Sequence, residues 1–229
     1  MTDQITANPI DALLDAALIH VPFDGWNEET FVAAIRDSGL DATVARGLCP
    51  RGALDLAILY HQRGDDAMVA RMEQAGFDNM RIRDKVTFAV RARIEAVDDR
   101  ELVQRGTTLF ALPQNAADGA KLIWGTSDRI WSAMGDSSRD LNWYSKRATL
   151  SAVYSSVVLY WLGDQSEGHS ATWEFLDRRI ENVMQFEKTK AAMRKAPVIG
   201  EVMTGLGKLF EQVKAPDRGP RNVPGGRPF

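Results

Sequence analysis

Few residues of this chain have the types and spacing that catalysis requires. The three histidines, His20, His61 and His169, lie far apart in the sequence, and Cys49 is the single cysteine. A structural zinc site needs about four clustered ligands, and helical di-iron sites use Glu-x-x-His pairs, which the chain lacks. It also lacks a glycine-rich phosphate loop and a G-x-S-x-G motif. The sequence therefore predicts a protein that is not an enzyme, with no metal site and no cofactor.

The most distinctive stretch runs from position 136 to 162 without Gly or Pro, which predicts a long helix. At about 100° per residue its apolar residues share one face: Leu150, Val153, Tyr154, Val157, Val158 and Trp161. Trp143 continues this face, but Lys146 and Arg147 flank it. Either Trp143 covers the end of the core while the cations extend into water, or it forms a partner anchor with Arg147. Periodicity alone favours the first interpretation.

The composition indicates one domain, or one domain with an appendage, because 229 residues with 45% apolar content can fill a core. The single cysteine fits a reducing compartment. The first residues are polar and acidic, without a secretory signal or Arg-rich presequence. The most apolar run, 153–162, is shorter than the about 20 residues of a membrane span. We therefore expect a bacterial cytoplasmic protein.

Helical periodicity recurs along the chain and strand patterns are almost absent, so we predict an all-α fold. The predicted helices cover 9–20, 28–38, 41–48, 52–63, 65–76, 80–97, 99–112, 116–135, 140–162 and 170–194. The pair 28–38 and 41–48, joined by a turn with Gly39, has a helix-turn-helix pattern and resembles the N-terminal domain of TetR-type transcription regulators.

Charge argues against DNA binding by this pair. Residues 1–64 carry nine acidic and four basic residues, and helix 41–48 offers only Arg46. Because phosphate neutralisation supplies most non-specific DNA affinity, we interpret the motif as retained packing and expect no nucleic-acid partner. A TetR-type ligand-responsive regulator is the alternative function.

Helix 80–97 has a mostly cationic outer side, for which two interpretations are open. Its predicted outward residues are Arg81, Arg83, Lys85, Arg91 and Arg93. They form either a solvated face or a surface attracted to acidic lipid or to an acidic partner.

The C-terminal part is basic, with nine Lys/Arg against three acids over 188–229. Residues 197–214 form an amphipathic segment, which we expect to associate with a membrane surface through Val198, Ile199, Val202, Met203, Leu206, Leu209, Phe210 and Val213. The alternative is a last helix docked on the domain. We divide the chain into a helix-turn-helix-like region (1–64), a helical lipid-binding region (65–195), the amphipathic helix (196–215) and a tail expected to be disordered (216–229).

Three segments together resemble the coenzyme Q biosynthesis protein nine family: Ile82-Arg-Asp-Lys-Val86, Asp140-Leu-Asn-Trp-Tyr-Ser-Lys-Arg147 and Thr172-Trp-Glu-Phe-Leu-Asp-Arg-Arg179. The resemblance covers about Leu13 to Phe210. It implies a TetR-like, all-α homodimer that acts as an accessory protein of ubiquinone biosynthesis. Such a protein binds an isoprenoid lipid or quinone in an apolar interior and lies peripherally on the inner face of the membrane.

The resemblance also implies a partner, the di-iron hydroxylase that acts on demethoxyubiquinone. The implied partner-binding residues are Ile130, Trp131, Asp140, Trp143, Tyr144 and Arg147. With the family in view, the partner interpretation of Trp143 is favoured. As candidate lipid-binding residues we take Phe88, Leu109, Trp124 and Val158.

Overall fold

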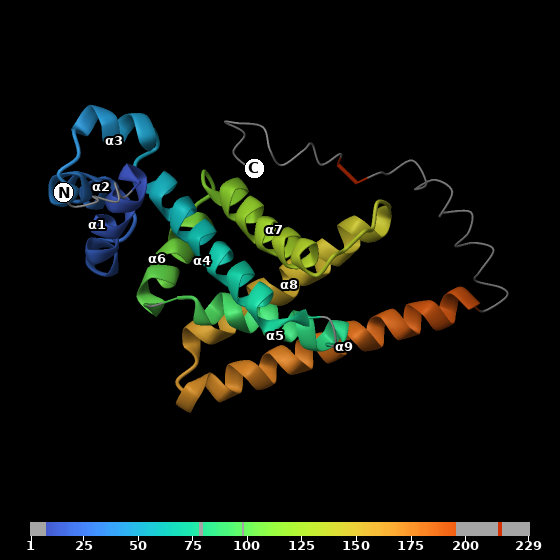
Figure 1. Ribbon diagram of the computed structural model, residues 1–229. Helices are drawn as coiled ribbons and strands as arrows, with labels where there is room; N and C mark the ends of the chain where they lie inside the picture. The colour runs from blue at the N-terminus through green and yellow to red at the C-terminus, as the bar shows by residue number, and fades with distance from the viewer. Residues whose placement is uncertain (1–7, 78–79, 98, 196–214, 217–229) are drawn as a thin grey trace. The chain divides into compact units, whose positions relative to one another are not determined.

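The computed structural model describes residues 8–77, 80–97, 99–195 and 215–216 (Figure 1). Every regular element in these ranges is a helix, so the predicted all-α class is confirmed. The chain forms two compact units, an N-terminal unit within 1–71 and 92–122 and a C-terminal unit within 72–91 and 123–229. Helices α4, α5 and α7 each contribute residues to both units.

The N-terminal unit begins with three helices: α1 (Pro9–Asp24), α2 (Glu28–Ser38) and α3 (Ala42–Leu48). Each begins after a side chain that accepts a hydrogen bond from the first turn: Asn8, Asn27 and Asp41. Gly39 turns the chain between α2 and α3 with φ of +69°, which glycine adopts without strain. The predicted helix-turn-helix pair is therefore present, and α1 continues four residues beyond its predicted end at His20, to Asp24.

These helices pack with α4 (Ala53–Ala75) and α6 (Arg100–Ala111) around an apolar core. Its fully buried members include Leu13, Leu14, Ala17, Val21, Phe31, Ala34, Ala45, Cys49 and Leu56. Cys49 is thus a buried core residue, as predicted. Burial of the apolar stripes of α1 and α2 holds the helix-turn-helix together.

The single basic residue of α3, Arg46, is engaged by its neighbours. Its guanidinium forms an ion pair with Glu28 of α2 and lies 4.6 Å from the centre of the Phe31 ring. Both contacts are made to the helix that precedes α3, so this side chain helps to hold α2 and α3 together.

The predicted helix break at Gly64 is wrong, because one continuous helix, α4, replaces the expected pair 52–63 and 65–76. A Cβ atom at Gly64 would lie 2.6 Å from Nη1 of Arg93. Arg93 is itself buried, donating from Nε to Oδ1 of Asp65 at 2.6 Å and from Nη2 to the His61 carbonyl at 3.0 Å. Gly64 therefore makes room for a buried guanidinium, and the prediction that Arg93 faces solvent is wrong.

The C-terminal unit contains most of α5 (Ile82–Glu95) and α7 (Ala116–Ala133), together with α8 (Leu141–Gly163) and α9 (Ser170–Lys195). A short 3-10 helix, η2 (Glu167–His169), connects α8 to α9. The Asp164 carboxylate fixes this corner by accepting from the Thr172 N–H at 2.9 Å, from the Thr172 hydroxyl at 2.5 Å and from the Ser166 N–H at 2.8 Å. These bonds hold the pKa of Asp164 well below its usual value.

Candidate functional site

The connection from α7 to α8 carries the residues with the most distinctive sequence pattern. After α7 the chain turns at Gly135, whose φ is +77°. Helix α8 then begins after Asp140, whose Oδ1 accepts from the Asn142 N–H at 3.0 Å while Oδ2 accepts from the Asn142 amide at 2.9 Å. Asp140 therefore fixes the start of α8, which places Trp143 and Tyr144 in its first turn.

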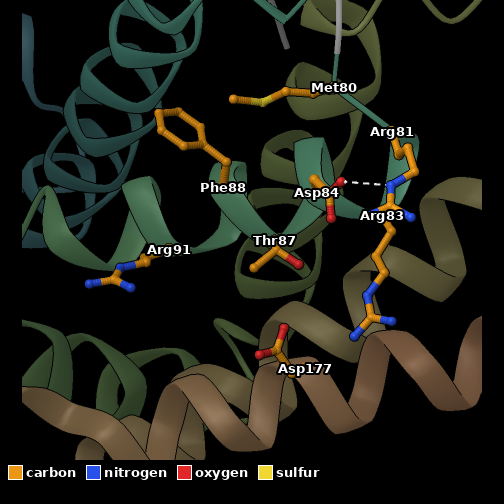
Figure 2. A pocket seen from close by; sticks show the side chains of 8 residues that line it. All are labelled: Met80, Arg81, Arg83, Asp84, Thr87, Phe88, Arg91 and Asp177. Carbon is orange, nitrogen blue, oxygen red and sulfur yellow. Dashed lines mark hydrogen bonds and ion pairs between the residues drawn. The ribbon is translucent and has the colours of Figure 1, made fainter.

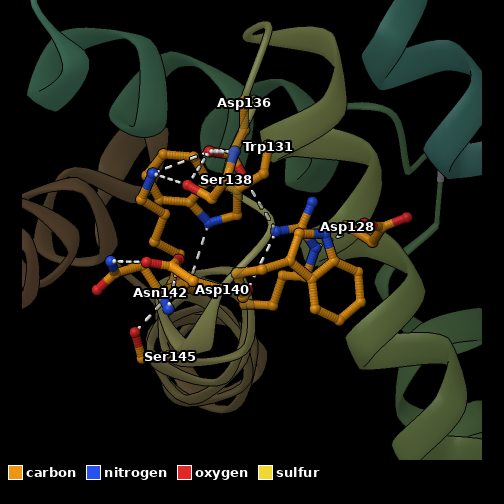
Figure 3. Close-up of polar contacts among 10 residues, drawn as sticks. Asp128, Trp131, Asp136, Ser138, Asp140, Asn142 and Ser145 are labelled. Atoms are coloured by element: carbon orange, nitrogen blue, oxygen red, sulfur yellow. Dashed lines mark hydrogen bonds and ion pairs between the residues drawn. The ribbon is translucent and has the colours of Figure 1, made fainter. Parts of the chain in front are cut away.

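Arg147 is the centre of an ion-pair network with Asp128 and Asp136, which are both labelled in Figure 3. Its side chain is 0% exposed, and it donates to Asp128 of α7 at 2.6 Å and to Asp136 of the connection at 3.0 Å. A third bond, from Nη1 to the Trp143 carbonyl at 3.1 Å, joins the guanidinium to its own helix. The network ties α7, the connection and α8 together, since a buried cation must remain paired.

Lys146 completes the network from the adjacent position of α8. Its ammonium group donates to Asp136 at 2.8 Å and to the Ser138 hydroxyl at 2.7 Å, and it lies 5.2 Å from the Trp131 ring centre. Burial on its own would raise the pKa of Asp136. The bonds from Lys146, Ser138 and Arg147 outweigh burial and hold that pKa well below its usual value.

Aromatic rings cover the buried guanidinium. The Arg147 Cζ atom lies 4.0 Å from the centre of the Trp143 ring. Trp143 in turn contacts Tyr144, at 4.7 Å between ring centres, and Trp124 of α7, at 5.8 Å. The Trp131 indole donates to the Lys146 carbonyl at 3.2 Å. The first turn of α8 is thus packed against α7 by rings as well as by charges.

The structure separates the six predicted partner-binding residues by exposure. Ile130 and Arg147 are completely buried, and Trp143 is 8% exposed. Trp131 and Tyr144 are half-buried, and Asp140 is exposed. All six lie in α7, α8 or their connection. The three that are accessible to solvent to a substantial extent are Trp131, Tyr144 and Asp140.

Two acidic residues of this site, Asp128 and Asp136, were not singled out in the sequence. The signal for them was indirect: an arginine on the apolar face of a helix requires acidic partners from elsewhere in the chain. Lys146 was noted only as a cation beside Trp143, for which extension into water was one of two interpretations. It instead bonds to Asp136, whose side chain is 3% exposed.

A second feature is an open groove of about 600 Å³ along α5, with Asp177 of α9 on its other side (Figure 2). Its lining residues are Met80, Arg81, Arg83, Asp84, Thr87, Phe88, Arg91 and Asp177. Arg83 donates to Glu181 of α9 at 2.8 Å, and the Arg91 guanidinium lies 4.7 Å from the Trp173 ring centre. Charged contacts therefore fasten α5 to α9 beside the groove.

Of the four candidate lipid-binding residues, Phe88 alone is among those that line the α5 groove. Trp124 packs on Trp143 and Tyr144. Val158 is half-buried in α8, whereas Leu109 packs against the core of the N-terminal unit. Their role in lipid binding stays a prediction.

The predicted membrane-associating residues, Val198 to Val213, lie outside the described residues, and so do residues 217–229 of the tail. Ala215 is described, and its N–H donates to the Arg139 carbonyl at 3.0 Å, one residue before Asp140. Among the helices that the structure describes, none has the length and apolar content to cross a membrane. Within the same residues, no group of three or more His, Cys, Asp or Glu side chains is placed to hold a metal ion.

The sequence of this chain is similar to that of the COQ9 proteins. The COQ9 family model matches residues 116–187, which include the α7–α8 connection and most of α9. The ubiquinone biosynthesis protein COQ9 of Drosophila melanogaster is 31% identical over 180 residues, covering 76% of this chain and 55% of that protein. COQ9 of Homo sapiens is 28% identical and covers 77% of this chain and 58% of its own length. The chain thus spans little more than half the length of these relatives.

A solved structure shares the fold. The TetR transcriptional regulator from Nitrosomonas europaea superposes with a TM-score of 0.62, covering 75% of this chain and 95% of that one. At 17% sequence identity this likeness shows the fold alone. The sequence matches agree with the resemblance drawn from the sequence: the chain is similar to the COQ9 proteins over about three quarters of its length, and it has a TetR-like helical fold.

Proposed function

We propose that this chain is a non-catalytic accessory protein of ubiquinone biosynthesis. It binds an isoprenoid quinone precursor, as a homodimer peripheral on a membrane, and presents the precursor to the di-iron demethoxyubiquinone hydroxylase. The names of its relatives, ubiquinone biosynthesis proteins, support the pathway. The reaction itself belongs to the hydroxylase.

The observation that carries the proposal is the buried support beneath the first turn of α8. Arg147, held by Asp128 and Asp136, fixes the backbone that bears Trp143 and Tyr144. A rigid aromatic surface loses little conformational entropy on binding, and Trp, Tyr and Arg are enriched at interface hot spots. Asp140 and the outer edges of Trp131 and Tyr144 form the contact surface for the hydroxylase in this proposal.

Lipid binding follows from the chemistry of the substrate. Moving a polyprenyl quinone from lipid into water costs a transfer free energy of about 0.8 kcal/mol for each CH₂ group. Its carrier must therefore offer an environment as apolar as lipid. The half-buried apolar residues Phe88, Trp124 and Val158 of the C-terminal unit are the candidates for that environment. In this proposal, the segment 197–214 would hold the lipid-binding region at the bilayer.

The TetR-like fold raises regulation of transcription as the other candidate, and the charges of α3 disfavour it. A DNA-reading helix needs basic side chains free for phosphates and bases. Here Arg46 is paired with Glu28 and packed on Phe31, within a region of nine acidic and four basic residues. We therefore propose that the helix-turn-helix serves as packing.

Replacing Tyr144 by Ala tests the partner surface, because Tyr144 is half-buried in the first turn of α8, where its ring contacts Trp143. The variant should remain folded and bind the hydroxylase at least tenfold more weakly in a pull-down titration, which is about 1.4 kcal/mol. Leu159→Ala is the matched control, since Leu159 lies on the same helix and is 61% exposed. Equal binding by both variants would remove the α8 surface from the proposal.

A further inference from the structure

The residues at the start of α5 combine protruding apolar side chains with cations. Ile82, the first residue of α5, is 61% exposed, and Met80 just before it is also exposed. Between them, the Arg81 side chain is 89% exposed, and Arg83 and Lys85 follow. Figure 2 shows Met80 and Phe88 on the same side of the groove, with Arg81 at its end. Exposed apolar side chains interleaved with cations are the composition of segments that lie in a membrane interface.

The cations here are held loosely. Arg81 donates to Asp84 at 3.2 Å, but both side chains are largely exposed, and exposed ion pairs contribute little and are screened by salt. The Arg83–Glu181 pair is also partly exposed, and Lys85 lies 5.9 Å from the Phe77 ring centre. These contacts leave the cationic groups at the surface.

Among the described residues around the groove, the charges are mixed with a small positive excess. Four cationic side chains, Arg81, Arg83, Lys85 and Arg91, stand near three acidic ones, Asp84, Asp177 and Glu181. So small an excess would give weak attraction by itself. The attraction is reinforced where neighbouring apolar side chains insert among the lipid acyl chains. The long side chains of Arg and Lys then extend to the lipid headgroups.

We infer that the start of α5, residues 80–85, is a membrane-contact site that binds the surface of a bilayer containing acidic lipids. Met80 and Ile82 enter the interface, and Arg81, Arg83 and Lys85 meet the lipid phosphates. This deepens the proposed function, on which it rests, by adding a contact within the described C-terminal unit that is separate from segment 197–214. The groove behind it would then open toward the headgroup layer, with Phe88 on its wall.

A dye at position 82 tests the contact directly. In the full-length Ile82→Cys chain, an environment-sensitive thiol dye will label position 82 selectively, because Cys49 is completely buried. Vesicles of phosphatidylcholine with about one third phosphatidylglycerol should shift its emission to the blue, and vesicles of phosphatidylcholine alone should shift it much less. The matched control is Ile19→Cys, since Ile19 is 67% exposed on α1 of the other unit, and its dye should not respond.

The charge contribution is tested by Arg81→Gln. Loss of one cation should lower the partition coefficient onto acidic vesicles about fivefold. Arg36→Gln removes a cation of α2 whose side chain is also largely exposed, and it should leave the partition coefficient unchanged.

Vesicle binding without a blue shift at position 82 would overturn the inference, and so would equal shifts on neutral and acidic vesicles. A chain that fails in this way yet still binds the hydroxylase through Tyr144 would leave the proposed function standing. Loss of hydroxylase binding together with an intact shift at position 82 would count only against the partner surface.

Discussion

The Arg147 Cζ atom lies 4.0 Å from the centre of the Trp143 ring, and no part of the Arg147 side chain reaches solvent. The Trp143 ring covers the guanidinium of Arg147, and Asp128 and Asp136 balance its charge. A lysine in place of Trp143 would bring a second cation to this position and disturb the fold. Tyr144 is for this reason the better residue for testing partner binding.

Replacing Arg147 by Met should lower the free energy of unfolding by roughly 1.5–3 kcal/mol, because the buried Asp136 carboxylate loses its bond from the guanidinium and keeps only those from Lys146 and Ser138. Urea denaturation followed by tryptophan fluorescence measures the loss. Arg36→Ala is the control, because its ion pair with Asp37 lies at the surface and its removal should not change the midpoint. Equal midpoints for both variants would show that the network contributes no stability.

Gly64→Ala should destabilise the chain even though alanine is the better helix former by about 1 kcal/mol. The new Cβ would lie 2.6 Å from Nη1 of Arg93, and Arg93 is held by Asp65 and cannot move freely. Gly125→Ala is the matched control, because nothing lies within 4 Å of a Cβ at that position of α7. It should stabilise the chain or leave it unchanged, and a rise in melting temperature for both variants would refute the role given to Gly64.

Stability should fall in acid through Asp136. Its pKa is lowered in the folded chain, so its ionised form stabilises the fold above the ordinary aspartate pKa of about 3.9. This contribution is lost as the pH falls from about 4 toward the lowered pKa. Unfolding free energies measured from roughly pH 6 to pH 3 should therefore decline, and Asp136→Asn should be less stable at neutral pH with a flatter decline. A variant with the same slope would show that other groups cause the acid sensitivity.

Duplex DNA should bind weakly and without sequence selectivity. Fluorescence anisotropy with DNA from upstream of the gene and with a scrambled duplex, at about 50 and 200 mM salt, measures both properties. Arg46→Ala should change neither, because Glu28 already engages that guanidinium. Tight, selective binding that Arg46→Ala abolishes would restore the regulator as the function.

Local signals made most of the fold predictable. Asn8 and Asn27 directly precede the predicted helices 9–20 and 28–38 and do cap them in the structure, because an N-cap needs only its own first turn. The helix-turn-helix pair was predictable for the same reason. The break predicted at Gly64 was wrong, because the reason for that glycine is Arg93, a residue far along the chain.

The candidate site was less predictable, since its central contacts join distant residues. Periodicity placed Arg93 on the outside of its helix, yet Asp65 of α4 pairs with it in the interior. In the same way, periodicity set Arg147 beside Trp143 without showing that Asp128 and Asp136 would bury it. Sequence periodicity gives the direction of a side chain, whereas the acids that make a buried cation tolerable come from other elements.

The claim that this chain carries a lipid is tested most directly by native mass spectrometry of the full-length protein purified from ubiquinone-producing cells, followed by extraction and identification of any bound molecule. We expect a dimer that retains an isoprenoid quinone precursor. A protein that carries no lipid, and that takes up no polyprenyl quinone when it is offered in vesicles, would contradict it.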